Sequence, residues 1–393
     1  MHTAPLSFAF LTCFGFWIPP EWSRDSLKFW VYNVYSIFTT ISLNTLCIWS
    51  VIDALLSADL TIFMDKISVC ISAVGVVGKN INLFIRREDI IRVTNKLLEE
   101  ACLPRDDEEE LIQQKFNTTA RFYNFQLKLT IWCEILNLCS VCFATIVPIR
   151  TFVTKRTLPL SEWVPYDVSS PLVYWTSFLF HTVTLMMCAS ISVAHETLIA
   201  GLMIESCAQL EILGHRFRNL PNSLVKAQSQ CKSAKECKVN ERSVTASLIR
   251  HHLEIYEFAL GFNEVFSLVI FMQFCISSTV LALSIFGMSA TDLFSVKFTW
   301  GCCYLGSMLM QVFLYCWFGN EVTLQSMNLG NAVYEMDWTR LPVDIMKDLI
   351  IIMARCTRAI KMSSAHIIVL SADSFTNIVK TSYSSFNLLK GSN

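Results

Sequence analysis

The side chains that could carry out chemistry in this sequence do not form the spacings that catalysis or metal binding requires. The stretch Gly75-Val-Val-Gly-Lys-Asn80 is too short for a phosphate-binding loop and lacks the Ser or Thr that follows its lysine. His195-Glu196 has no second histidine four residues later, so it is not a zinc-protease helix. Cys231 and Cys237 have the wrong spacing for zinc. We therefore predict that the protein is not an enzyme and binds no metal or cofactor.

A different kind of chemistry is suggested by the polar residues near the C-terminus. The segment 364–389 is apolar enough at its start to be a membrane helix, yet it carries polar and ionisable side chains at Asp373, Asn377, Lys380, Thr381, Ser382, Ser384, Ser385 and Asn387. Such groups are costly in a bilayer and normally face protein or water. Thr381, Ser385 and Leu389 recur every four residues and so share one helical face. A polar face that ends in leucine suits a pore wall with a hydrophobic constriction. The same pattern fits equally well a helix that is buried inside a bundle and uses its hydroxyls for hydrogen bonds to neighbouring helices.

The elements that would position these residues are transmembrane helices. Of the 393 residues 53% are hydrophobic and only 16% are charged, against about a quarter charged in an average soluble domain. A membrane helix needs about 20 mostly apolar residues. Seven segments meet this requirement, the last one weakly: 29–52, 62–85, 124–149, 172–199, 259–286, 297–319 and 364–389. We expect a single all-α domain of seven transmembrane helices over 1–393.

The distribution of lysine and arginine predicts the orientation. With the N-terminus in the cytoplasm, the segments 1–28, 86–121, 201–258 and 320–361 are cytoplasmic and contain most of the 31 Lys and Arg residues. The C-terminus is then extracellular. This orientation, and the absence of Asp-Arg-Tyr and Asn-Pro-x-x-Tyr motifs, disfavours a G-protein-coupled receptor. The net charge of −1 gives no reason to expect a nucleic-acid partner.

Several segments outside the predicted spans look helical or membrane-associated. Apolar stripes at helical spacing predict helices over 202–220, 244–260 and 343–361. These helices either pack within one chain or form a cytoplasmic anchor, built from 201–258 and 320–361, at which subunits join. In the N-terminal part (1–28), an apolar segment is expected to lie at the membrane surface. The sixteen cysteines of the whole chain are expected to be reduced.

Motifs in the C-terminal third resemble the insect odorant receptor family. They read Leu-Tyr-Cys-Trp-Phe-Gly-Asn-Glu (314–321), Ala-Val-Tyr-Glu-Met-Asp-Trp (332–338) and Ser-Tyr-Ser-Ser-Phe-Asn-Leu-Leu (382–389). Earlier pieces such as Gly-Phe-Trp-Ile-Pro-Pro (15–20) agree, so the resemblance covers nearly the whole chain. The ending is less similar to the related gustatory receptors.

The resemblance implies a tetrameric, non-selective cation channel gated by a small volatile, hydrophobic odorant. Such receptors lie in the plasma membrane of the olfactory sensory neuron dendrite, in contact with membrane lipid. The second cytoplasmic loop lacks the insertion of the family's co-receptor, so this chain resembles an odour-specific subunit that joins the co-receptor in a hetero-tetramer. A gustatory-type or homomeric chemoreceptor channel is the alternative, and a transporter or G-protein-coupled receptor is a third class.

The resemblance also assigns site residues. The family's pore is lined by the last helix, here 364–389, with Thr381, Ser385, Leu388 and Leu389 at the pore and gate. Its ligand pocket lies in the outer half of the bundle, which here offers Met64, Ser68, Phe143, Val147, Phe178, His181, Leu185, Tyr304 and Ser307. Apolar walls with a few hydroxyls suit a volatile with one or two polar atoms. Ordinary helix packing is the alternative role for each of these residues.

One charge pair is expected inside the membrane. Lys79 and Glu134 both fall in the inner parts of adjacent predicted spans. Because an unpaired charge there is expensive, we expect the two to form an ion pair.

Overall fold

The structure, a computed structural model, describes most of the chain and is almost entirely helical. It describes residues 5–117 except 24 and 98, eleven residues scattered between 131 and 149, and residues 157–391 except 230, 290, 292–294 and 366. The helices in the first part are α1 (Pro5–Cys13), α2 (Leu27–Leu55), α3 (Leu60–Ile85), α4 (Arg87–Lys96) and α5 (Asp107–Asn117). The second part contains α7 (Pro171–Arg218), α8 (Leu220–Ser229), α9 (Ala234–Ser289), α10 (Val296–Tyr334), the short helix η1 (Trp338–Arg340), α11 (Val343–Cys356) and α12 (Ala372–Gly391).

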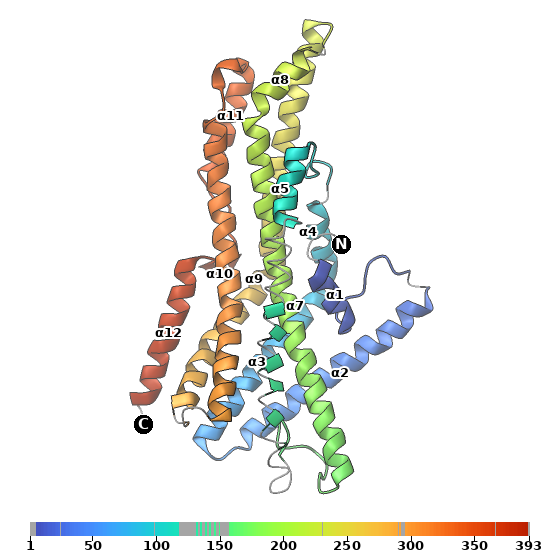
Figure 1. Ribbon diagram of the computed structural model, residues 1–393, viewed down its shortest axis with the longest axis vertical. Helices are drawn as coiled ribbons and strands as arrows, with labels where there is room; N and C mark the ends of the chain where they lie inside the picture. Colours follow the sequence, from blue (N-terminus) through green and yellow to red (C-terminus); the bar gives the residue numbers. More distant parts are fainter. Residues whose placement is uncertain are drawn as a thin grey trace.

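Three very long helices form the axis of the molecule. Helices α7, α9 and α10 contain 48, 56 and 39 residues, which corresponds to lengths of about 72, 84 and 58 Å. They run side by side through most of the long axis in Figure 1. Because the hydrocarbon core of a bilayer is about 30 Å thick, no more than part of each helix can lie in the membrane. We call the half that contains α8 and α11 the upper half, and the half that contains α2, α3 and α12 the lower half.

Five of the predicted spans coincide with helices that are long and apolar enough to cross a membrane. These helices are α2, α3, α7, α9 and α10, among the residues that the structure describes. The exposed apolar side chains of α2, such as Trp30, Val34 and Phe38, are those that a lipid-facing helix needs. The predicted span 124–149 lies largely outside the described residues, although those described within it are helical.

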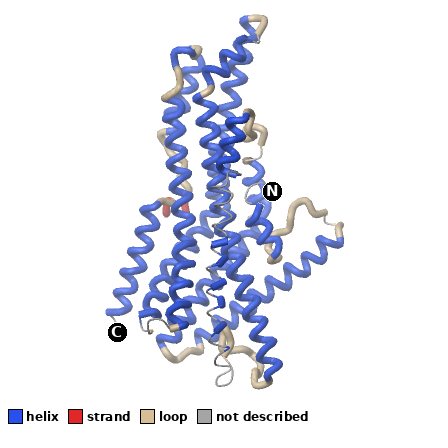
Figure 2. Tube along the Cα trace, viewed as in Figure 1, coloured by secondary structure: helices blue, strands red, loops and turns tan. Residues whose placement is uncertain are grey.

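The last helix is shorter at its start than the sequence predicted. The described residues between 364 and 371 are not helical; instead β1 (Ser363–Ser364) pairs antiparallel with β2 (Ile368–Val369), and α12 begins only at Ala372. Figure 2 shows this small hairpin as the red segment beside the upper end of α12. The hairpin is fixed by bonds to α9, since the backbone N–H of Ala365 donates to Ser267 Oγ (2.6 Å) and that of Ser363 donates to Asn263 Oδ1 (2.9 Å). The apolar residues before Ala372 therefore belong to an extended hairpin. The spacing of apolar residues along the sequence does not distinguish this hairpin from the first turns of a helix.

The three helices expected outside the spans are present. Residues 202–218 belong to α7, which ends two residues before the predicted end at 220, 244–260 lie within α9, and α11 covers most of 343–361. Their apolar stripes form the core of the upper half, where Leu213, Phe217, Phe258 and Leu349 are fully buried. The exposed apolar residues Ile350 and Ile351 of α11 are not used by this packing.

A buried ion pair fixes the loop before α5 to this core. Arg216 donates to both carboxylate oxygens of Glu109 (2.8 and 2.7 Å) and to the carbonyls of Ala101 and Leu103 (2.5 and 2.6 Å). Arg216 also donates to Nδ1 of His251 (3.0 Å). Four acidic residues, 107–110, form the first turn of α5, and one of their carboxylates, that of Glu109, is buried as the partner of Arg216.

One face of the N-terminal segment packs against the rest of the protein. Helix α1 lies against α7, where Ser7 and Thr197 share a hydrogen bond of 2.9 Å and Leu11 is fully buried. The indole of Trp17 is buried beside Phe8, with ring centroids 4.9 Å apart. The fifteen cysteines within the described part of the chain are all unpaired.

Candidate ligand cavity and last helix

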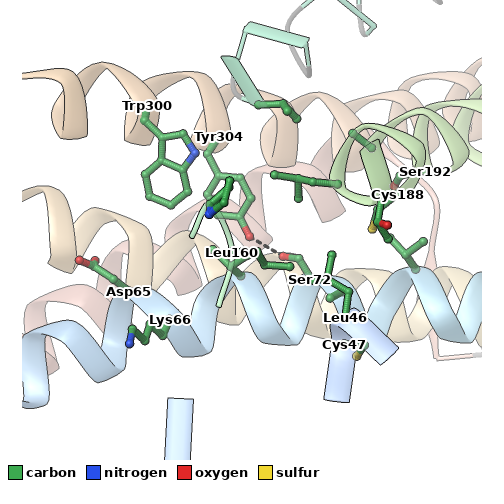
Figure 3. A pocket seen from close by; sticks show the side chains of 18 of the residues that line it. Leu46, Cys47, Asp65, Lys66, Ser72, Leu160, Cys188, Ser192, Trp300 and Tyr304 are labelled. Carbon is green, nitrogen blue, oxygen red and sulfur yellow. Dashed lines mark hydrogen bonds between the residues drawn. The ribbon is translucent and has the colours of Figure 1, made fainter. Parts of the chain in front are cut away.

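A cavity of about 520 Å³ lies in the lower half between α2, α3, α7, α9 and α10. This volume is in the range of small-molecule sites. Most of its lining is apolar, with walls formed by Leu43, Leu46, Val69, Val76, Leu158, Leu185, Ile276 and Met308. The cavity extends along α3 from Ile62 to Lys79, a length of about 26 Å at 1.5 Å per residue. Figure 3 shows Asp65 and Lys66 toward one end of it, and Cys188 and Ser192 toward the other.

The end of the cavity near Asp65, which we call the mouth, is bordered by charged residues. Lys66 forms ion pairs with Asp53 (3.0 Å) and Glu162 (3.2 Å), and Asp65 pairs with Lys297. The Asp53 carboxylate also accepts from the backbone N–H groups of Glu162 and Trp163, each at 3.2 Å. These contacts hold the segment 158–163 over the mouth.

The middle of the cavity contains one hydroxyl pair on an otherwise apolar wall. Ser72 of α3 and Tyr304 of α10 share a hydrogen bond of 2.5 Å, which is drawn as a dashed line in Figure 3. Tyr304 also donates to the carbonyl of Ser68 (3.2 Å), and its ring stacks on Trp300 with centroids 5.4 Å apart. This cluster joins α3 to α10 across the cavity.

The other end of the cavity, which we call the floor, is polar. Lys79 Nζ donates to Glu196 Oε1 (2.5 Å) and to Ser192 Oγ (3.0 Å). Gln273 donates to Gln311 Oε1 (2.6 Å). All of these side chains except Glu196 line the cavity.

The predicted partner of Lys79 is therefore wrong. Lys79 pairs with Glu196 of α7, whereas Glu134 Oε2 accepts from Ser190 Oγ at 3.1 Å. The sequence placed Lys79 and Glu134 at similar depth, but the rotation of each helix decides which charges meet. In the sequence Glu196 stands beside His195, and no local pattern links it to Lys79.

Two of the nine predicted ligand residues line the cavity. These are Leu185 and Tyr304. Ser68 is buried beside it and lines a small adjoining pocket, while Met64, Phe178 and Ser307 are absent from the cavity lining. Phe143 and Val147 lie outside the described residues.

His181, the ninth predicted residue, is fully buried next to the cavity but does not line it. Its ring packs against Trp49 with centroids 5.9 Å apart. Neither of its ring nitrogens has a hydrogen-bond partner among the described residues.

The prediction missed the α3 residues that line the cavity because it assigned the wrong rotation of α3 about its own axis. On α3 the cavity is lined by Asp65, Val69, Ser72 and Val76, one residue beyond the predicted pair Met64 and Ser68. One residue corresponds to a rotation of 100° about the helix axis. The i, i+4 spacing was visible in the sequence, but no sequence signal fixed which face of α3 points into the bundle.

Helix α12 lies at the edge of the molecule and exposes a polar face. It packs on α9 and α10 through Phe375, whose ring is 5.7 Å from that of Phe313, and Ser382, which donates to the Ser278 carbonyl (3.2 Å). The opposite face is exposed and consists mainly of polar side chains: Asp373, Thr376, Asn377, Lys380, Thr381, Ser384 and Asn387. These positions recur at intervals of three and four residues, which defines one helical stripe.

Two of the four predicted pore and gate residues lie on and beside this stripe. Thr381 is exposed and donates to the Asn377 carbonyl (2.8 Å), whereas Ser385 is half-buried and donates to the Thr381 carbonyl (2.9 Å). Leu388 and Leu389 belong to α12, but their side chains lie outside the part of the chain whose side chains are described.

Comparison with known proteins identifies the family of this helical bundle. The family described as "7tm Odorant receptor" matches residues 59–383. This chain belongs to that family. The membership covers every helix from α3 to α10 and most of α12, and it places the chain among receptors rather than enzymes.

Individual relatives are distant in sequence but similar in fold. Odorant receptor 46a, isoform B, of Drosophila melanogaster is 26% identical over 65% of this chain and 65% of its own length. Odorant receptor Or1 of Anopheles gambiae is 24% identical over 66% of each chain, so the matched part is just under two thirds of either relative. The structure of the insect olfactory receptor OR5 from Machilis hrabei, in complex with eugenol, has a TM-score of 0.83 at 16% identity and covers 99% of this chain and 98% of that one. The match confirms the expected fold class, a helical membrane bundle of the insect receptor type.

Proposed function

We propose that this chain is the odour-binding subunit of a ligand-gated, non-selective cation channel. It binds a small volatile in the cavity of the lower half and lines part of a central pore with α12. It works with the insect co-receptor in a hetero-tetramer, in the plasma membrane of the olfactory sensory neuron dendrite.

The observation that carries the proposal is the exposed polar stripe on α12. Lys380 and Asp373 are exposed on a single subunit, and their helix α12 lies beside the lower parts of α9 and α10 in Figure 1. A charged or polar face cannot remain against lipid, so it requires water or another subunit. A ring of subunits with this stripe at its centre satisfies the requirement and forms a hydrated pore.

The cavity supplies a ligand site that is separate from the pore. The eugenol complex of the similar receptor is a precedent for a small aromatic volatile bound to this fold. Ligand binding drives opening only to the extent that the open state binds the ligand more tightly. Helix α9 provides a mechanical link, because Gln273 and Ile276 line the cavity and Ser278 bonds to Ser382 of α12.

The orientation in this proposal puts the N-terminus and the upper half in the cytoplasm. The sequence contains one Asn-x-Ser/Thr sequon, Asn117-Thr-Thr, at the end of α5 in the upper half. It stays unglycosylated in this orientation. A glycan on Asn117, seen as a glycosidase-sensitive mass shift, inverts the assignment.

The functional test is whole-cell current evoked by a broad panel of volatiles, with the chain expressed alone and with the co-receptor. Current only from the pair supports the proposal, while current from the chain alone replaces it with a homomeric receptor. Silence in both, with surface labelling positive and the co-receptor answering its own agonist, refutes odour gating. In a responsive pair, Leu389→Ala tests the gate: basal current rises if Leu389 closes the pore, and an unchanged basal current removes that assignment.

A further inference from the structure

The floor of the cavity has a composition that a purely hydrophobic binding site does not need. Lys79, Ser192, Gln273 and Gln311 come from four different helices, α3, α7, α9 and α10, and each has an exposed fraction of 8% or less. Burying polar groups in this way is costly unless each of them is bonded. The floor is therefore a built polar site at one end of an apolar cavity.

The hydrogen bonds at the floor leave donors available to a ligand. An ammonium group has three N–H donors, and Lys79 has two acceptors among the described residues, Glu196 and Ser192. Gln311 Nε2 has two N–H donors and a single long contact, to Ser192 Oγ at 3.4 Å. Both side chains line the cavity, so one donor from each can face its interior.

The charge at the floor is already balanced. Lys79 and Glu196 have exposed side-chain fractions of 3% and 2% and pair at 2.5 Å. A carboxylate ligand would bring a second negative charge close to Glu196 in a medium of low dielectric constant. An uncharged acceptor adds a hydrogen bond without adding a charge.

The rest of the cavity determines the body of the ligand. Between the floor and the Ser72–Tyr304 pair, the walls are provided by apolar side chains such as Leu46, Val76 and Met308. From Lys79 to Ser72 the distance along α3 is about 10 Å. This length accommodates an alkyl or aryl body between the two polar positions.

We propose that the floor recognises an uncharged carbonyl oxygen, so that the ligands of this receptor are volatile ketones, aldehydes or esters bound with the carbonyl at Lys79 and Gln311 and the apolar body toward Tyr304. The proposal rests on the proposed function, because it names the ligand class of the same cavity.

The test uses matched ligands on the chain expressed with the co-receptor. The probes are methyl ketones of six to ten carbons, the alkanes of equal length and the corresponding carboxylates. For the intact receptor, ketones are expected to activate at concentrations at least about tenfold lower than alkanes, the value of one good hydrogen bond to a charged donor. Carboxylates are expected to be weaker than ketones.

Two variants examine the floor itself. Gln311→Leu removes the amide at nearly constant volume, and the double variant Lys79→Met with Glu196→Gln removes both charges together. Each is expected to reduce the ketone-to-alkane potency ratio by about tenfold, while alkane potency changes less than about threefold. Gln325→Leu is the matched control, since Gln325 lies on the same helix α10, outside the cavity lining. It should leave the ratio unchanged.

Each result decides the question. Equal potency of ketones and alkanes in the intact receptor, greater potency of carboxylates, or parallel loss of all ligands in surface-expressed Gln311→Leu overturns the carbonyl assignment and leaves odour gating in place. Silence toward every volatile, while the co-receptor answers its own agonist, overturns the proposed function and the ligand class with it.

Discussion

Gly319 of α10 is a position where a single methyl group should disturb the connection to the last helix. Leu370, the residue two before α12, is fully buried against it. A Cβ atom on Gly319 would overlap the Cβ of Leu370 and lie 2.9 Å from the Leu370 carbonyl oxygen. Because one of the clashing atoms belongs to the backbone, a rotamer change cannot relieve the overlap. The substitution Gly319→Ala must therefore move the segment between the hairpin and α12.

The expected loss of stability is a difference between two terms. Overpacking of a tight contact costs typically about 1–3 kcal/mol, and the backbone clash puts this site near the upper value. Replacing a helical glycine by alanine returns about 1 kcal/mol of helix propensity. The net change is a destabilisation of roughly 2 kcal/mol.

The measurement is the thermal unfolding of purified receptor in detergent, with Gly214→Ala as the control. A Cβ on Gly214 of α7 meets its nearest neighbour, the Cβ of Ala332, at 3.6 Å, which is an ordinary contact. The control therefore keeps the propensity gain of about 1 kcal/mol. At about 2 °C per kcal/mol or less for a chain of this size, the two variants should differ in melting temperature by about 5 °C. If Gly319→Ala melts at or above the temperature of Gly214→Ala, the steric argument is refuted.

Three further predictions concern the buried charges. Arg216→Met leaves a buried carboxylate without its partner and should lower the free energy of unfolding by about 3–5 kcal/mol, whereas the exposed Arg340→Met should change it by less than about 0.5 kcal/mol; equal melting temperatures would contradict this. Burial lowers the pKa of His251 to about 3, with Arg216 adding to the effect, so the unfolded chain binds the proton first as pH falls below about 6.5. The contribution of His251 should therefore lower the free energy of unfolding by up to about 1.4 kcal/mol per pH unit as pH falls from 6.5 to 3. The variant His251→Gln should show a shallower dependence of melting temperature on pH. Identical slopes in the two proteins would show that His251 does not contribute. Exchange of the two charges, Lys79→Glu with Glu196→Lys, should retain surface expression better than either Lys79→Met or Glu196→Gln alone, and equal loss in all three would show that the pairing of opposite charges is not what folding requires.

The two hydrogen-bond partners of His251 fix which of its ring nitrogens carries the proton. Arginine can only donate, so His251 Nδ1 accepts from Arg216 and His251 Nε2 donates to Gln209 Oε1, at 2.9 Å. Protonation of Nδ1 would break the first bond and place two positive charges in contact. The neutral imidazole is therefore part of the buried cluster.

The sequence by itself determined the class of the molecule. Apolar segments of about 20 residues are long enough to cross a bilayer, and five of them coincide with membrane-length helices. The polar residues of the last helix were evident because such residues are rare in membrane segments. The motifs at 314–321, 332–338 and 382–389 predicted the family, which the match over 59–383 confirms.

Only the tertiary structure decided which residues meet. A helical period gives the spacing of a face but not its rotation in the bundle, so the lining of α3 was predicted one residue too early, at Met64 and Ser68. The same uncertainty assigned Lys79 to Glu134 although it pairs with Glu196. Whether the segment before Ala372 forms a helix or a hairpin depends on bonds to Ser267 and Asn263, about a hundred residues away in the chain. Contacts between distant segments fix rotation, pairing and the starting point of the last helix, and local sequence pattern carries no information about them.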